Sequence, residues 1–330
     1  MLLKNILWLT QGNDNLPSVR FRVLPIAKEI LNHKINVTTA RYPKTVGSRF
    51  AFLTKLFFSE SRYDICIIQK RLLSSLEIST LRHAAKKIVF DFDDAIWTDQ
   101  NEASPPGFGK KWNRFQNTTS AVDLVVAGNK YLADAIRGNI PKFISPTPID
   151  TQYYSPKKTC DVNYSPIIGW MGTSSYIPGT ETAIRSIRTI SKNKIRVISN
   201  ALPDKRLLND VEFIRWSPEN ELTQLQNISI GIMPLPDDGY TRGKCGFKLL
   251  QYMSCKVVPI ASAVGFNREV ITHGIDGFLV ENESQWAEYA KILIDNKKLL
   301  EQMANSARKT VENRFDLRNT TSALLSHLFN

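Results

Sequence analysis

Short runs of hydrophobic residues recur along the chain, and most are followed by a longer segment in which hydrophobic residues repeat with helical spacing. This alternation is typical of a parallel β-sheet whose strands are connected by crossover helices. Six such runs in each half of the chain have the length and composition of buried strands. They span 5–10, 36–40, 65–69, 87–91, 124–127 and 142–144, and then 167–171, 196–199, 211–214, 228–233, 257–261 and 277–280.

Three prolines (Pro146, Pro148 and Pro156) separate the two sets of runs, and prolines interrupt helices and strands alike. We therefore predict an α/β protein of two doubly wound, Rossmann-like domains that face each other across a cleft. The first would span residues 1–148 and the second 149–315, followed by an amphipathic helix over 316–330. Ligands of such domains bind at the carboxyl ends of the strands, so the loops after strands are the candidate sites.

Small residues follow the first strand of the second domain. Gly172, Thr173 and Ser174 form a loop between this strand and a helix. Such a loop presents backbone N–H groups and hydroxyls to a phosphate, aided by the positive end of the helix. A tight turn with a Ser or Thr cap explains the pattern about as well.

A later loop of the second domain is basic. Arg242, Lys244 and Lys248 gather around the start of an expected helix, where the helix dipole disfavours positive charge. A bound diphosphate would resolve this conflict. Because Lys244 and Lys248 are four residues apart, they would share one helix face, with Gln251 on the neighbouring stripe. A basic, solvated turn is the alternative interpretation.

Three carboxylates, Asp91, Asp93 and Asp94, crowd at the end of a strand in the first domain. Such crowding costs energy unless a cation or a bound proton offsets it, so the pKa values should be driven apart. The pattern fits a carboxylate that binds a sugar acceptor, a metal-binding Asp-x-Asp, or the nucleophile of an aspartyl-phosphate phosphatase. Helix capping by Asp93 or Asp94 is the structural alternative, and the phosphatase motif normally lies on the first strand of its domain.

The loop after the first strand contains Gly12 and leads into a helix with Ser18, Arg20 and Arg22. It lacks the glycine spacing of the dinucleotide-binding fingerprint, which disfavours a nicotinamide cofactor. Ser18 and the two arginines are candidates for contact with a phosphate or an acceptor, although arginines on the surface of a first helix are equally common. We expect neither a metal nor an organic cofactor.

The net charge of +12 is concentrated in the first 148 residues, where 21 Lys and Arg stand against 12 Asp and Glu, compared with 22 against 19 in the rest. A basic surface suits an anionic membrane, a phosphorylated acceptor or nucleic acid. The segment 49–62 interleaves phenylalanines with basic residues, which fits either a helix on a membrane surface or a core-packed helix with a basic outer face. No run reaches the roughly 20 apolar residues of a membrane span, so a cytoplasmic protein is expected, soluble or peripheral on the inner face of the membrane.

These motifs resemble those of bacterial glycosyltransferases of the GT-B fold, close to glycosyltransferase family 4 (glycosyl transferases group 1). The most specific stretch is 243–253, with the sequence GKCGFKLLQYM, followed by Pro259, Gly265, Glu269, Gly274 and 277–280. Supporting stretches are 91–94, 128–132, 148–150 and 169–172.

The resemblance implies a nucleotide-diphosphate sugar donor bound mainly by the second domain. It implies a glycan or lipid-linked acceptor, as in lipopolysaccharide, O-antigen or capsule assembly, bound mainly by the first domain, and no nucleic acid. Transfer would retain the anomeric configuration without a metal, and the helix over 316–330 would pack back on the first domain. The loop 172–174 and the three cations would face the diphosphate, Gln251 the ribose, and Asp94, beside Asp93, the acceptor or the transferred sugar.

Two positions depart from the family pattern. Family 4 usually has two Glu separated by seven residues in the donor-site helix, and here these positions are Gly243 and Gln251. Gln can still bond a ribose hydroxyl, but the carboxylate that touches the sugar ring is missing. A nucleotide-sugar 2-epimerase of the same fold and a non-catalytic nucleotide-sugar-binding protein are the alternative functions.

Overall fold

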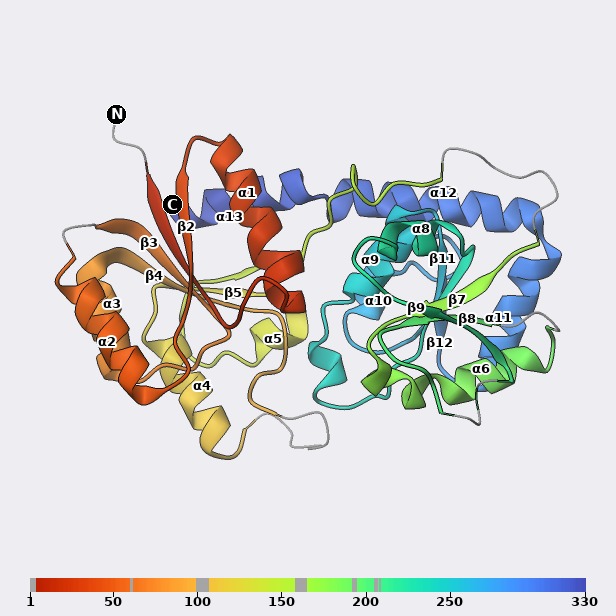
Figure 1. Ribbon diagram of the computed structural model, residues 1–330, viewed down its shortest axis with the longest axis horizontal. Coiled ribbons are helices and arrows are strands. Elements are labelled where there is room, and N and C mark those ends of the chain that lie inside the picture. The colour runs from red at the N-terminus through yellow and green to blue at the C-terminus, as the bar shows by residue number, and fades with distance from the viewer. Residues whose placement is uncertain are drawn as a thin grey trace. The chain divides into compact units, whose positions relative to one another are not determined.

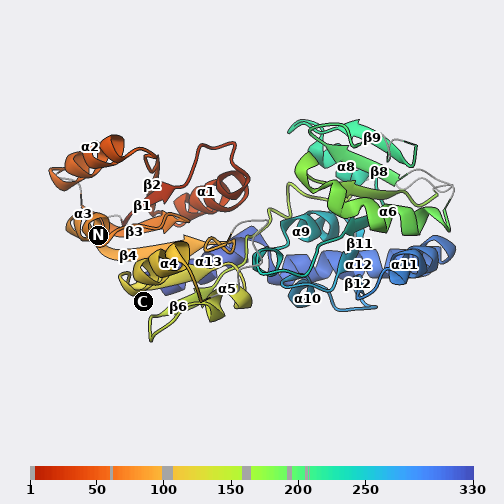
Figure 2. The ribbon, with the colours of Figure 1, turned by 90° about the horizontal axis from the view of Figure 1, so that it is seen from below.

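The computed structural model describes residues 4–59, 62–98, 107–157, 165–191, 195–204, 207 and 209–330. The chain divides into two compact units, each of which can be followed in Figures 1 and 2. The first unit contains Met1–Pro148, Asp238–Cys245 and Leu317–Asn330, and the second contains Ile149–Asp237 and Gly246–Asp316. Asp238–Cys245 lies within the predicted second domain, but this segment packs with the first unit, where Cys245 joins the hydrophobic core.

A six-stranded sheet with parallel pairing forms the centre of the first unit, in the order β2-β1-β3-β4-β5-β6. The carboxyl-terminal parts of the central strands β3 and β4 are buried and mostly hydrophobic, whereas the edge strand β2 is mostly polar and exposed. The direction of strand order changes between β1 and β3, which makes their carboxyl ends the preferred ligand edge. The strands are β1 (Asn5–Thr10), β2 (Asn36–Arg41), β3 (Tyr63–Gln69), β4 (Ala85–Phe92), β5 (Leu124–Ala127) and β6 (Lys142–Ile144).

Helices cover both faces of this sheet because alternate side chains of each strand point to opposite faces. Ile6 and Trp8 pack under α1 and α13, whereas Leu7 and Leu9 belong to the core under α2 to α5 (Figure 1). The C-terminal helix α13 thus completes the core of the first unit. The helices are α1 (Leu24–Asn32), α2 (Val46–Phe57), α3 (Ser75–Ala84), α4 (Lys110–Ser120), α5 (Lys130–Asp134) and α13 (Leu317–Phe329).

The second unit has its own six-stranded parallel sheet, in the order β12-β11-β10-β7-β8-β9. Here the strand order changes direction between β7 and β10, so the loops after these two strands flank the preferred ligand position. Its strands are β7 (Ile168–Met171), β8 (Ile195–Ser199), β9 (Val211–Arg215), β10 (Ile230–Met233), β11 (Val258–Ser262) and β12 (Phe278–Val280). Its helices include α6 (Glu181–Arg188), α8 (Glu221–Gln226), α9 (Phe247–Ser254), α10 (Asn267–Val270), α11 (Ser284–Asp295) and α12 (Lys297–Arg314).

The predicted doubly wound α/β fold is confirmed. Each of the twelve predicted strands is present, and its ends lie within two residues of the prediction. This agreement has a physical reason: strands buried on both faces of a parallel sheet need uninterrupted hydrophobic runs, which stand out in a sequence.

Candidate functional site

Arg22 and Asp91 form a buried ion pair in the first unit. The π-helical turn Val19–Val23 that precedes α1 directs Arg22 toward β4, where its Nη2 lies 2.6 Å from Asp91 Oδ1 and its Nε donates to Oδ2 at 3.0 Å. Nη1 donates to the carbonyl of Ser145, and both side chains of the pair are at most 2% exposed. The guanidinium of Arg22 is therefore held inside the unit by Asp91, and its contact with a phosphate or an acceptor stays a prediction.

Lys70 binds the other two carboxylates of the acidic cluster. It directly follows β3, at the strand-order change of the first sheet, and its ammonium contacts both Asp93 and Asp94. The Lys70 backbone has a φ of 53°, a left-handed conformation that is unusual for a residue with a side chain, and its N–H donates to the carbonyl of Asp91. The positive charges of Arg22 and Lys70 offset the crowding of the three carboxylates. They also exclude the phosphatase interpretation, because its presumed nucleophile, Asp91, is buried in an ion pair.

The surroundings shift the pKa values of the two remaining carboxylates, Asp93 and Asp94, in opposite directions. Burial raises the pKa of Asp93, and the charge of Asp94 adds to this effect while Lys70 opposes it. Burial also acts on Asp94, but the charges of Lys70 and Lys244 outweigh it and lower its pKa. Lys244 Nζ lies 3.4 Å from Asp94 Oδ1, and the Asp94 side chain is 28% exposed. Asp94 is therefore an accessible, ionised carboxylate held between two ammonium groups.

The segment that carries Lys244 is fixed to the first unit by its backbone. Asn129 caps α5 with its side-chain oxygen and donates from Nδ2 to the carbonyl of Lys244. A Cβ atom at position 243 would lie 2.8 Å from the backbone nitrogen of Ala95, so no side chain fits there without a shift. Gly243 occupies the position of the first family Glu, and this close contact accounts for the missing side chain.

The N-terminal loop contributes less than the sequence analysis expected. The carbonyl of buried Gly12 accepts a hydrogen bond from the Thr10 hydroxyl, and the carbonyl of Ser18 accepts one from Gln69. The half-buried Arg20 lies with its guanidinium 4.6 Å from the centre of the Phe21 ring. Gly12 and Ser18 shape the loop through their backbones, whereas Arg20 remains a side chain that a ligand can reach.

Lys248 and Gly172 meet in the second unit at the strand-order change between β7 and β10. The Lys248 ammonium lies 4.7 Å from the centre of the Trp170 ring and 5.8 Å from that of Tyr176. A Cβ atom at position 172 would lie 2.8 Å from Lys248 Nζ and closer still to the Trp170 ring, so glycine leaves the room that this arrangement needs. The Lys248 ammonium thus lies against the backbone of the loop after β7.

Two neighbours of Gly172 define the rest of this loop. The backbone N–H of Ser174 donates to Asn200 at 2.8 Å, and the Thr173 hydroxyl lies within hydrogen-bond distance of Ser175. Helix α9 begins only at Phe247, so the expectation that Lys244 and Lys248 share a helix face is wrong. Lys244 and Arg242 belong to the first unit, and Lys248 belongs to the second.

Gln251 lies in a buried network of the second unit. Its amide donates to the Tyr154 hydroxyl and to Glu221, and only 3% of the residue is exposed. Glu221 also accepts hydrogen bonds from Tyr154 and from the Trp216 indole. These contacts connect α8 to α9 and give Gln251 a structural role inside the unit, and its contact with a ribose stays a prediction.

Three residues of the site were not predicted from the sequence: Lys70, Tyr240 and Glu221. Lys70 directly follows a buried strand. A lysine at the carboxyl end of a parallel strand can be identified from the sequence as a candidate site residue. Tyr240 accepts a hydrogen bond from Lys244 at 2.9 Å and places its ring under the ammonium. Glu221 offers no such signal, since its burial arises from packing between α8, α9 and Tyr154.

Comparison with known proteins gives a family match and several similar structures. Residues 197–310 match the family model described as glycosyl transferases group 1. HepE from Anabaena, solved in complex with UDP and glucose, is 15% identical, with a TM-score of 0.71 over 98% of this chain and 99% of its own. Sucrose-phosphate synthase from Thermosynechococcus elongatus is 13% identical, with a TM-score of 0.76 over 99% of each chain. WaaB, a lipopolysaccharide outer core galactosyltransferase, is 13% identical, with a TM-score of 0.66 over 98% and 99%. No curated protein sequence matches the chain.

The two doubly wound units thus have the fold of the GT-B glycosyltransferases, as the resemblance implied. The family match covers Lys248, Gln251 and the strands around them. The chain therefore has the GT-B fold, and a segment of its second unit matches a glycosyltransferase family model.

Proposed function

We propose that the chain transfers a sugar from a nucleoside diphosphate sugar to a glycan or lipid-linked acceptor of the cell surface. The observation that carries the proposal is the Lys248 ammonium, which lies against the Gly172 loop at the strand-order change of the second sheet. A cation beside backbone N–H groups at the carboxyl edge of a parallel sheet suits a diphosphate, and it would stabilise the charge that grows on the leaving group.

We infer that uridine is the base, because HepE was solved with UDP and with UDP and glucose. Thermal-shift measurements with UDP-, GDP-, dTDP- and CMP-sugars test this, since a ligand that binds only the folded state raises the melting temperature. UDP-sugars should give the largest shift. Incubation with the donor alone separates transfer from epimerisation, because an epimerase converts the sugar without an acceptor.

Lys248→Ala should weaken UDP binding by about 10- to 100-fold, because a hydrogen bond between charged partners is worth roughly 1.5–3 kcal/mol. Titration calorimetry with UDP measures the change. Lys291→Ala, on the exposed surface of α11 in the same unit, is the matched control and should bind UDP like the unmodified chain. An unchanged UDP affinity in Lys248→Ala would remove this side chain from the donor site.

We propose further that transfer retains the anomeric configuration. An inverting enzyme needs a general base, and the lowered pKa of Asp94, caused against its burial by Lys70 and Lys244, makes it a weak one. An ionised carboxylate at this position suits stabilisation of the positive charge that develops on the sugar ring. NMR of the first-formed product distinguishes the two outcomes, and an inverted product would contradict this role.

The acceptor proposal rests on the surface of α2 and on the similarity of the fold to WaaB, a lipopolysaccharide outer core galactosyltransferase. Helix α2 packs Leu53 against the core of its unit, yet Phe50 and Phe58 are 73% and 77% exposed. Lys55 and Arg62, from the same segment of the sequence, are also exposed. Leu53 thus fits the core-packed interpretation of this segment, and the exposed Phe50 and Phe58 support the proposal of a membrane-facing surface. Among the helices that the structure describes, none combines the length and apolar character needed to cross a bilayer.

We expect the chain to bind vesicles of phosphatidylglycerol and phosphatidylethanolamine through α2, and to lose most of this binding as salt screens the basic residues. Phe50→Ser with Phe58→Ser should weaken binding at least about tenfold, since burial of one such side chain is worth roughly 1.5–3 kcal/mol. Sedimentation with the vesicles gives the bound fraction. Ile275→Ser, which alters an exposed apolar residue of the second unit, should bind normally. Binding that ignores salt, lipid charge and the two phenylalanines would contradict the proposal.

A further inference from the structure

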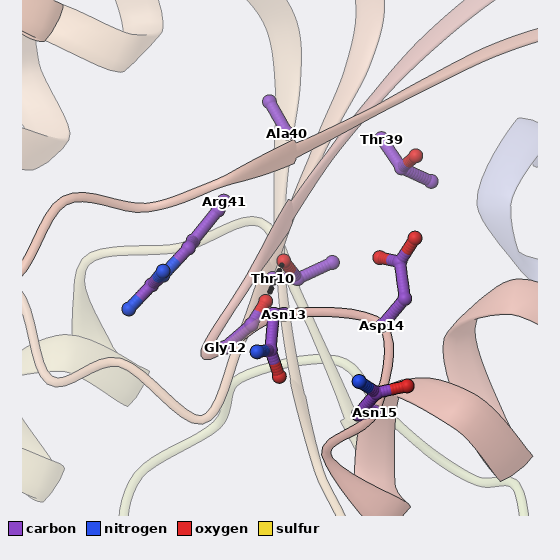
Figure 3. A pocket seen from close by; sticks show the side chains of 8 residues that line it. All are labelled: Thr10, Gly12, Asn13, Asp14, Asn15, Thr39, Ala40 and Arg41. Carbon is purple, nitrogen blue, oxygen red and sulfur yellow. Dashed lines mark hydrogen bonds between the residues drawn. The ribbon is translucent and has the colours of Figure 1, made fainter.

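A polar pocket lies in the first unit beside the carboxyl ends of β1 and β2 (Figure 3). Its volume of about 480 Å³ falls within the roughly 300–1,000 Å³ of small-molecule sites. One wall is the loop after β1, and the other is the end of β2. The lining residues are Thr10, Gly12, Asn13, Asp14, Asn15, Thr39, Ala40 and Arg41.

Hydrogen bonds hold the backbone around the pocket in place, whereas several polar side chains that line it are available to a ligand. The Thr10 hydroxyl donates to the carbonyl of Gly12, as drawn in Figure 3, and Gln69 accepts a hydrogen bond from the backbone N–H of Gln11. In contrast, the side chains of four lining residues make no hydrogen bond or ion pair with any residue that the structure describes, and all four are exposed. These four are Asn13, Asp14, Asn15 and Arg41.

The chemistry of this lining matches a saccharide. Two amides, a carboxylate, hydroxyls and a guanidinium supply donors and acceptors in the mixture that vicinal sugar hydroxyls require. None of the eight lining residues is aromatic or a long aliphatic, which gives a nucleobase no ring to stack on and a lipid chain no apolar wall. In Figure 3, Asp14 and Thr39 lie on one side of the end of β1 and Arg41 on the other, so polar side chains lie on both sides of this strand end.

The position of the pocket determines which part of an acceptor it can hold. The strand order β2-β1-β3-β4 places the end of β4, with Asp93 and Asp94 after it, two strands from β1 and three from β2. Neighbouring strands lie about 4.8 Å apart, so the pocket is roughly 10–14 Å from the acidic pair along one edge of the sheet. A single sugar bound in the pocket does not reach Asp94.

We propose that this pocket binds a sugar unit of the acceptor remote from the accepting hydroxyl, so that the acceptor is an oligosaccharide of at least two units and not a single sugar. The proposal rests on the proposed transfer to a glycan. It assigns Asn13, Asn15 and Arg41 to acceptor recognition, a role that is separate from donor binding in the second unit.

Saturation-transfer NMR tests the pocket directly, with and without UDP. The probes are methyl glycosides of glucose, galactose, mannose and N-acetylglucosamine, together with α- and β-linked disaccharides of these sugars. We expect at least one disaccharide to bind about tenfold more tightly than its methyl monosaccharide. Asn15→Ala with Arg41→Ala should weaken that binding about tenfold, because two sets of hydrogen bonds are lost.

Two controls separate this proposal from the donor proposal. Asn32→Ala with Arg185→Ala alters exposed residues of the same types outside the pocket and should bind saccharides normally. Calorimetry with UDP is run on every variant, and the pocket variant should bind UDP like the unmodified chain. A chain that binds UDP but none of the saccharides, or a pocket variant that binds them unchanged, overturns the pocket proposal alone. Failure to bind UDP overturns the donor proposal, and the saccharide experiment without UDP still decides on the pocket.

Discussion

Replacement of Arg22 by methionine should lower the free energy of unfolding by about 3–5 kcal/mol, because it leaves the buried carboxylate of Asp91 without its cation. Burial alone would lower the pKa of Arg22, but the charge of Asp91 and the hydrogen bonds to it raise the pKa above its ordinary value, as a strongly held pair requires. Urea unfolding followed by circular dichroism measures the loss. Such a loss is a large part of the stability of an ordinary domain.

The double replacement Arg22→Met with Asp91→Leu is the matched control. It removes both charges, and buried ion pairs replaced by hydrophobic side chains of similar volume often lose little stability. We expect it to recover at least half of the loss. If Arg22→Met is instead as stable as the unmodified chain but binds UDP or acceptor poorly, then the guanidinium contacts a ligand, as the sequence pattern suggests.

Asp94→Asn should lower kcat about 100-fold or more while UDP affinity changes less than threefold. The substitution keeps the shape of the side chain and removes the negative charge held between Lys70 and Lys244, and electrostatic groups of this kind typically contribute 100- to 1,000-fold. Initial rates with the identified donor and acceptor, together with UDP calorimetry, measure both quantities. A kcat within a few fold of normal would remove Asp94 from the reaction.

Asp93→Asn, at the neighbouring position, is the comparison for Asp94→Asn. Burial raises the pKa of Asp93, so an amide resembles the protonated state toward which its surroundings drive this carboxyl. We expect a smaller loss of kcat than for Asp94→Asn. Asp134→Asn, an exposed carboxylate on α5, should behave normally, and equal losses in the two neighbours of the acidic cluster would contradict the separation of their roles.

The strands were predictable because burial on both faces leaves a hydrophobic run that needs no knowledge of the rest of the chain. The unit to which a segment of the chain belongs was harder to predict. Asp238–Cys245 follows β10 of the second sheet, so sequence order alone assigns it to that domain. Its attachment to the first unit depends on contacts with Asn129 and Ala95, which lie more than 100 residues away.

In the candidate site, too, some features could be predicted from the sequence and others depend on contacts between distant residues. Charged residues in loops after strands could be identified from the sequence, and Asp94 and Lys248 do lie at the carboxyl edges of their sheets. Whether a charge faces a ligand or another residue is decided by its partner. Arg20 and Arg22 are two residues apart, yet one lies over a neighbouring ring and the other is buried against β4. A pattern of residue types does not contain that difference.

The distribution of the chain between its two units affects how the protein is made. The polypeptide passes from one unit to the other four times, and α13 supplies Leu324, Leu325 and Leu328 to the hydrophobic core beside β1. On the ribosome, α1 is available early to cover part of the apolar face around Trp8, but the part that α13 covers waits until these leucines have been synthesised. The core of the first unit can therefore be completed only after the segments of the second unit have been synthesised, although its N-terminal residues emerge first.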